Sequence, residues 1–140
     1  MSTFATRRTP LFWACALLLP PLLGVSAAQA ATPAELLAAY TKAAGAPPSA
    51  ERGQKLFTTK GPGDFGWSCA SCHTDDPTKV GKHAASDKPV PPLAPSANKQ
   101  RFTTHNKVEF HFNLNCKDVL NRECTSAEKA DVMAWLLSFK

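Results

Sequence analysis

The most restrictive feature of the sequence is a Cys-X-X-Cys-His motif made by Cys69, Cys72 and His73. Two thiols at this spacing can add to the two vinyl groups of one haem, and the adjacent histidine then presents its imidazole to the iron. A thioredoxin-like redox motif has no need of that histidine. A zinc site would require a second pair of Cys or His ligands at finger-like spacing, which the sequence lacks. The motif therefore predicts one covalent haem c, with His73 as an axial ligand of its iron.

The first 30 residues have the pattern of an export signal. Arg7 and Arg8 precede an apolar run over residues 11–25, and residues 28–30 (Ala-Gln-Ala) form a small-residue cleavage site. Prolines flank or interrupt the run, which is too short to span a bilayer comfortably. We expect residues 1–30 to be a cleaved signal peptide, and residues 31–140 to form one periplasmic cytochrome c domain that is not embedded in the membrane. The paired arginines leave twin-arginine export open as the route.

Removal of residues 1–30 shortens the 140-residue chain to 110 residues and lowers its formal charge from +5 to +3, because Arg7 and Arg8 leave without an acidic residue. A domain of this size has a modest core of its own, which a central haem would enlarge. The lysines are scattered among acids and prolines, without an aromatic platform for stacking on bases. This pattern argues against a nucleic-acid partner and leaves open a mildly basic docking face for an acidic redox protein.

Helix signals dominate the rest of the chain, and no segment alternates long enough to predict a strand. Residues 32–35 form a capping box with proline at the first helical position, which predicts a short helix that ends at Gly45. A second helix should begin near Ser49 and lead, through a Gly/Pro-rich loop at 61–66, to the haem motif. Residues 74–97 are rich in proline and lysine, so we expect irregular structure along one haem edge.

Two more helices are expected in the C-terminal part of the chain. Val108, His111, Phe112 and Asn115 fall on one helical face, and a capping box at residues 125–128 starts the last helix. The predicted fold class is therefore all-α, a small helical domain around one covalently bound haem.

In small c-type cytochromes, the helix before the haem motif crosses the C-terminal helix at a glycine. Gly53 and Phe57 are the residues of the second helix that match this arrangement. Val132 and Trp135 lie on the apolar face of the last helix. We expect these two pairs of residues to meet.

The sixth ligand of the iron is not fixed by the motif. Met133 is the one methionine after the predicted signal peptide, but it lies inside the last helix, where core packing is its expected role. His83 and His105 fit a solvated surface. His111 shares a helical face with Asn115 and could be a core histidine, a distal ligand or a hydrogen-bond donor to a bound ligand. These alternatives stay open at the level of residue patterns.

Several short motifs resemble those of one known family, the sphaeroides haem protein family of c-type cytochromes. The similarity extends over essentially the whole chain after the signal peptide, beyond the haem motif itself. The motifs that carry it are residues 92–97 (PLAPSA), 101–103 (RFT), 115–116 (NC), 122–125 (RECT) and 128–131 (EKAD).

This resemblance implies a class I cytochrome c fold in which Asn115 is the sixth ligand of ferric haem. On reduction the asparagine leaves, and the ferrous iron can bind oxygen or nitric oxide. Electrons would come from a dihaem cytochrome c, a membrane cytochrome b, or both. Cys116 with Cys124 matches the family's disulfide. The sequence departs from the family at His111, where tryptophan is common, and this histidine could compete with Asn115 for the iron.

Two functions from different classes are consistent with the sequence. The first is a haem protein that binds a diatomic gas and is ligated by His73 and Asn115 when ferric. The second is a low-spin electron-transfer cytochrome with His73 and either His111 or Met133 as ligands. In the second case, Asn115 would only cap or turn the chain at a helix end. No pair of acidic residues suggests a catalytic site beyond the haem, so the sequence leaves enzyme activity undecided.

Overall fold

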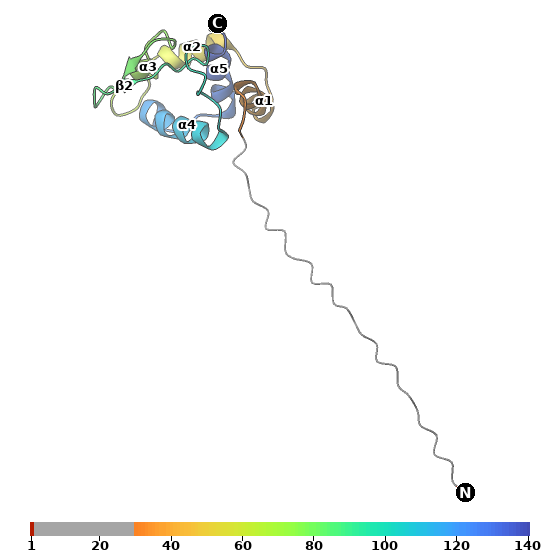
Figure 1. Ribbon diagram of the computed structural model, residues 1–140. Helices are drawn as coiled ribbons and strands as arrows, with labels where there is room; N and C mark the ends of the chain where they lie inside the picture. The colour runs from red at the N-terminus through yellow and green to blue at the C-terminus, as the bar shows by residue number, and fades with distance from the viewer. Residues whose placement is uncertain (2–29) are drawn as a thin grey trace.

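The structure, a computed structural model, describes residue 1 and residues 30–140 (Figure 1). The predicted signal peptide, residues 1–30, lies outside this described part except for its two end residues. The elements in chain order are α1 (Pro33–Ala44), α2 (Ala50–Thr58), α3 (Ala70–His73), β1 (Gly81–Lys82), β2 (Pro89–Val90), α4 (His105–Leu120) and α5 (Ser126–Leu136). Within residues 30–140, no helix has both the length and the apolar character that crossing a bilayer requires.

Both predicted capping boxes are formed. At α1, the Thr32 hydroxyl accepts a hydrogen bond from the backbone N–H of Glu35, whose carboxylate accepts one from the backbone N–H of Thr32. Thr125 and Glu128 make the same pair of bonds at the start of α5. Each box satisfies backbone donors that the start of a helix would otherwise leave unpaired.

Helices α2 and α5 cross in close backbone contact at Gly53. A β-carbon at this position would overlap the carbonyl oxygen of Asp131, so a glycine is required for the approach. Beside the crossing, the rings of Phe57 and Trp135 pack with their centroids 4.8 Å apart. The Arg52 guanidinium also donates to the Asp131 carboxylate across 2.7 Å. The helix crossing expected from the sequence is confirmed.

Helix α4 lies across the molecule from α3 and the small hairpin (Figure 1). It begins at His105 and continues to Leu120, after which Asn121 takes a left-handed conformation with φ 56°. Asn115 is therefore well inside the helix, and the interpretation that it caps or turns the chain at a helix end is wrong. The sequence allowed that interpretation because Cys116 follows at once, but this cysteine also lies within the helix.

The segment at residues 74–97 contains a short hairpin that the sequence did not predict. Strand β1 pairs antiparallel with β2, with Gly81 opposite Val90. Strands of two residues are too short to produce an alternating pattern, which explains the missed prediction. The rest of the segment consists of turns and bends without helix, as expected.

Two buried clusters hold the helices together, and α5 contributes to both. In the first, Tyr40 of α1 and Val108 of α4 pack with Met133, which is fully buried. In the second, Phe57 of α2 packs with Trp135. The core role expected for Met133 is therefore confirmed.

Candidate haem site

A cavity of about 440 Å³ lies between α3 and α4, which stand on opposite sides of the molecule in Figure 1. Cys69, Cys72 and His73 line it from the α3 side, and His111 and Asn115 line it from α4. Its volume falls within the range of about 300–1,000 Å³ that is typical of cofactor sites. Much of the remaining wall is apolar and includes Leu56, Phe57, Val90, Leu93, Phe102, Phe112 and Leu136. The fold thus brings the predicted haem-motif residues and both candidate distal ligands to one cavity.

His73 is prepared to act as a metal ligand. Burial, followed by the proximity of Arg101 and His111, lowers the pKa of His73 to about 4, so the imidazole is neutral at pH 7. Its Nδ1 atom is buried without a hydrogen-bond partner among the described residues. A buried imidazole nitrogen without a partner is unfavourable, whereas a neutral imidazole is the form that binds a metal. The ring therefore fits the axial position of a haem iron.

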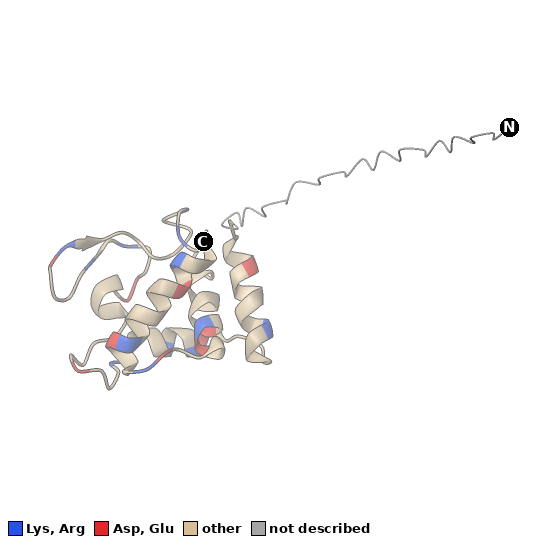
Figure 2. Ribbon diagram, turned by 90° about the horizontal axis from the view of Figure 1, so that it is seen from below, with Lys and Arg blue, Asp and Glu red and all other residues tan. Residues whose placement is uncertain are grey.

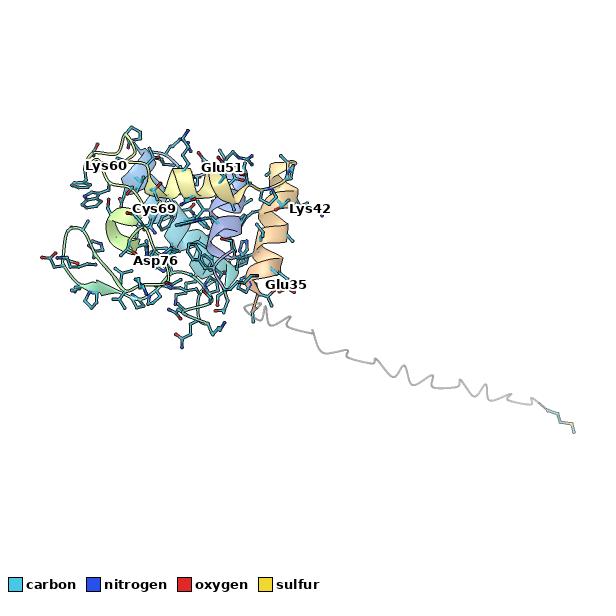
Figure 3. All side chains as sticks on the ribbon, turned by 90° about the horizontal axis from the view of Figure 1, so that it is seen from above. Glu35, Lys42, Glu51, Lys60, Cys69 and Asp76 are labelled. Carbon is cyan, nitrogen blue, oxygen red and sulfur yellow. A yellow bond between two sulfur atoms is a disulfide. The ribbon has the colours of Figure 1, made fainter. Side chains whose placement is uncertain are left out.

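The two motif cysteines are free thiols at the edge of this cavity. Burial raises the pKa of Cys69 to about 11. This residue lies beside α2 (Figure 3) and packs against the cluster around Phe57. The Sγ atom of Cys72 accepts a hydrogen bond of 3.3 Å from the backbone N–H of Ala84. Redox-active Cys-X-X-Cys pairs depend on a lowered thiol pKa, so the environment of Cys69 disfavours a thioredoxin-like role.

The distal wall presents two polar side chains from one face of α4. His111 and Asn115 are four residues apart, so they lie one helical turn apart, or about 6 Å along the axis. His111 is exposed at the cavity and makes an edge contact with the ring of Phe110, whereas Asn115 is half-buried. The structure thus retains both as candidates. In contrast, Met133 does not line the cavity.

A disulfide lies directly beside Asn115. Cys116 and Cys124 are joined, with their Cα atoms 5.6 Å apart. The bond connects the second half of α4 to the segment that leads into α5. At that segment, Arg122 donates two hydrogen bonds, of 2.6 and 2.8 Å, to the Glu128 carboxylate. The pairing implied by the family resemblance is thus present in the structure.

Arg101 belongs to the cavity wall, although no individual role was predicted for it from the sequence. Its guanidinium donates to the backbone carbonyl oxygens of Pro92 and Pro91, at 2.9 and 2.7 Å. No carboxylate pairs with it among the described residues. A half-buried cation is costly without a counter-ion, and a haem would bring two propionate carboxylates. Arg101 therefore fits the cofactor, and only the folding of the loop around residues 91–92 brings it there.

Two other residues line the cavity, although the sequence did not predict that position for them. His83 was expected on the surface, and it is exposed, but it also lines the rim of the cavity. Its Nδ1 accepts hydrogen bonds from the backbone N–H groups of Ala85 and Ser86. Trp67 lines the cavity as well and stacks on the exposed ring of Phe65, with the centroids 4.4 Å apart. These positions depend on loop geometry, for which the sequence carries no periodic signal.

Charged side chains of both signs are interspersed over the described elements (Figure 2). Lys82 and Asp87, for example, form an exposed ion pair of 2.8 Å on the hairpin. Near the cavity, Arg101 and Lys107 are cationic, whereas Asp118 is acidic. The charge pattern is therefore mixed, in agreement with the low net charge of the chain.

Comparisons with known proteins identify relatives over most of the chain. A family described as a domain of unknown function (DUF1924) matches residues 43–136. Cytochrome c-type protein SHP from Cereibacter sphaeroides is 45% identical over 117 residues, which are 82% of this chain and 90% of that protein.

Solved structures agree with this relationship. The structure of oxidised SHP, described as an oxygen-binding cytochrome c, superposes with a TM-score of 0.74 at 44% identity and covers 78% of this chain and 98% of that one. The solution structure of cytochrome c'' from Methylophilus methylotrophus, whose subject includes haem-ligand detachment, has a TM-score of 0.68 at 38% identity, covering 76% and 92%. The predicted cytochrome c-like fold is confirmed.

The cofactor follows from these relatives together with the cavity. Cytochromes of the c type bind haem covalently, and here the paired thiols, the neutral imidazole of His73 and the uncompensated Arg101 guanidinium fit such a group. The chain belongs to the sphaeroides haem protein family and is a c-type cytochrome with one covalent haem c.

Proposed function

We propose that this chain is a periplasmic cytochrome whose haem is held by His73 and Asn115 when ferric, and whose distal side opens on reduction to admit a diatomic ligand. Cys69 and Cys72 would form the two thioether bonds. The observation that carries the proposal is that His73 and Asn115 line one cavity from opposite elements, α3 and α4.

The chemistry of the asparagine supports a site that is closed in one oxidation state and open in the other. A haem iron that changes oxidation state supplies electron transfer and the capacity to bind small gases. The amide oxygen of Asn115 is a hard, neutral donor that suits a ferric centre better than a ferrous one. Among the described residues, none forms a hydrogen bond with the Asn115 side chain, so the amide is available to the cavity that it lines. The family relative SHP is described as oxygen-binding, which favours oxygen or nitric oxide as the ligand class.

A second candidate function rests on His111. Its imidazole lines the same cavity as that of His73, from the opposite wall. An imidazole is a stronger ligand for ferrous iron than an amide, so ligation by His73 and His111 would give a low-spin electron carrier. Because His111 and Asn115 are one turn apart, we expect only one of them to reach the iron at a time.

The proposed electron donor is a dihaem cytochrome c or a membrane cytochrome b, an assignment that rests on the family resemblance alone. Export through a cleaved signal peptide at residues 1–30 is likewise proposed from the sequence pattern. Mass spectrometry of the protein purified from the periplasm should give residues 31–140 plus one haem. A haem that acid acetone extracts would refute the two thioether bonds.

The gas-binding proposal is tested by absorption spectra of the reduced protein with and without carbon monoxide. The wild-type protein should bind carbon monoxide readily. Asn115→Ala should change the ferric spectrum and leave the carbon monoxide complex intact, while Met133→Leu, a change in the core, should leave both spectra nearly unchanged.

His111→Ala separates the two candidate functions. If the reduced wild-type protein is low-spin and does not bind carbon monoxide, and if only His111→Ala makes it high-spin, the iron is held by His111. The electron-carrier function would then replace the gas-binding one.

A further inference from the structure

A buried ion pair joins the distal helix to the rest of the molecule. Lys129 of α5 is only 9% exposed, and its Nζ atom donates to Oε2 of Glu109 on α4 across 2.8 Å. The hydroxyl of Tyr40 on α1 donates to the other carboxylate oxygen of Glu109 across 2.5 Å. One carboxylate thus ties α4 to two other helices.

Aromatic contacts connect this group to the cavity. The Nζ atom of Lys129 lies 5.7 Å from the ring centroid of Tyr40 and 5.9 Å from that of Phe112. The two rings meet edge to face with their centroids 5.9 Å apart. Phe112 lines the cavity and is the residue after His111. A displacement of Glu109 would therefore be transmitted to the cavity wall through Phe112.

The same helix is fixed at its other end by different means. Cys116 is bonded to Cys124, and the backbone N–H of Gly63 donates to the carbonyl oxygen of Val119 across 3.0 Å. A β-carbon on Gly63 would overlap the carbonyl oxygen of Asp118, so the loop closely abuts the end of α4. The section that carries His111 and Asn115 lies between these two attachments.

The energetics do not require an ion pair for stability at this junction. A buried lysine is rare because its desolvation is costly, and apolar side chains of similar volume often stabilise a fold equally well. A carboxylate that accepts hydrogen bonds from a lysine and from a hydroxyl adds a directional contact, since hydrogen bonds have a preferred geometry and apolar contacts do not. Such a contact can define the position of α4 relative to α5.

We propose that Lys129, Glu109 and Tyr40 are positioning residues, which hold α4 at the distance from α3 that the distal ligand requires. This inference rests on the proposed haem site and applies whether the distal ligand is Asn115 or His111. None of the three side chains touches the cofactor in this role. They act through Phe112 and the helix backbone.

The test compares Lys129→Met with Asp131→Asn in the haem-loaded protein. Both changes disrupt an ion pair anchored on α5, but Asp131 pairs with Arg52 of α2 and not with α4. Both variants should be less resistant to denaturant than the wild type. We expect Lys129→Met alone to change the rate of carbon monoxide binding, by about twofold to thirtyfold, and to shift the ferric absorption spectrum. Asp131→Asn should keep the wild-type rate and spectrum.

Two further variants keep the test decisive. Tyr40→Phe removes a single hydrogen bond and should change the rate in the same direction by a smaller factor, which covers the case that Lys129→Met does not fold. Lys129→Arg, which keeps the charge, should restore most of the wild-type rate. Loss of stability in Lys129→Met and Tyr40→Phe with an unchanged rate and spectrum would overturn the proposal.

The reduction potential separates this inference from the proposed function. If the wild-type protein does not bind carbon monoxide, the gas-binding proposal fails, and the potential becomes the readout. Lys129→Met should then still shift the potential relative to the wild type, because the distal ligand is displaced, while Asp131→Asn should not. Equal potentials in all three proteins would overturn the positioning role.

Discussion

The two walls of the haem cavity are built in different ways. The α3 side rests on the crossing of α2 and α5, where Gly53 brings two backbones together and Phe57 packs on Trp135. Within the described part of the chain, the α4 side has no glycine-mediated helix crossing. Helix α4 is held by the Lys129–Glu109 ion pair near its start, by the Cys116–Cys124 disulfide in its second half, and by the loop at Gly63 against its C-terminal end. The first wall offers one imidazole, whereas the second offers a choice between two side chains.

This difference indicates where the reactivity of such a cytochrome can be adjusted. Close backbone packing leaves the first wall little freedom to move, because in a dense interior even one added methylene group displaces the neighbouring atoms. Helix α4 can move by small amounts if its few attachments change. In the proposed site, the wall with the stronger sequence motif would therefore fix the cofactor, and the wall with the weaker motif would decide what the iron binds.

The largest effect is expected from a substitution that disrupts the α2–α5 crossing. Gly53→Val places a side chain against the carbonyl oxygen of Asp131 and should destabilise the protein by about 3 kcal/mol. Gly45→Ala is the matched control. Gly45 has a positive φ of 66°, but no other heavy atom lies within 4 Å of the added β-carbon, so this change should cost only about 1 kcal/mol of stability. Denaturant unfolding followed by circular dichroism measures both. Equal losses in the two variants would contradict the close packing inferred for this wall.

An intermediate effect is expected from the disulfide on the other wall. Replacing Cys116 and Cys124 by serine should lower the free energy of unfolding by about 2–3 kcal/mol through the loss of loop closure. The ferric spectrum should change as well, because Asn115 adjoins the bond, while the haem stays covalently attached. In the wild-type protein, thiol labelling under denaturing, non-reducing conditions should find neither cysteine free. Stoichiometric labelling, or a variant with a wild-type spectrum, would show that the disulfide does not control the distal wall.

The smallest effect is a pH dependence at the junction between α4 and α5. The hydrogen bonds from Arg122, which are the main cause, lower the pKa of Glu128 to about 2 from its ordinary value of 4.5. A carboxyl group whose pKa is lower in the folded state stabilises the fold above pH 4.5, and this contribution is lost as the pH falls towards 2. The stability difference between the wild type and Glu128→Gln should therefore shrink across that range.

Arg122→Gln provides the complementary measurement for this junction. Without the guanidinium, most of the lowering of the Glu128 pKa should disappear, and the variant should lose less stability than the wild type between pH 4.5 and 2. Denaturant midpoints measured at several pH values give the comparison. Parallel pH profiles for the wild type and both variants would show that this ion pair does not contribute to acid stability.

Much of the first wall could be predicted from local sequence. The haem motif is contiguous, the capping boxes at Thr32 and Thr125 are defined by a spacing of three residues, and Gly53 has the position expected for a helix crossing. The second wall was predicted less well. The length of α4 beyond Asn115 was missed there. On the first wall, beside α3 (Figure 1), the hairpin at residues 81–90 was also missed, because its two-residue strands are too short to give an alternating pattern.

The remaining omissions concern residues whose surroundings depend on tertiary contacts. Arg101 depends on the carbonyl oxygens of Pro91 and Pro92, which turn towards it only in the folded loop. No individual role was predicted for Lys129, and its ion pair depends on Glu109, which is 20 positions away. Neither relationship has a fixed spacing along the chain. A single sequence therefore reveals the residues that bind through a local motif and misses those that act through distant partners.

The placement of His111 and Asn115 on one face of α4 also has an evolutionary consequence. Two polar side chains one turn apart present different chemistry to the same cavity while the helix, the disulfide and the opposite wall stay as they are. A point mutation at either position would thus exchange an oxygen donor for a nitrogen donor, or remove one of them, without a new fold. Descendants of one ancestral gene could in this way divide into gas-binding proteins and electron carriers by very few substitutions.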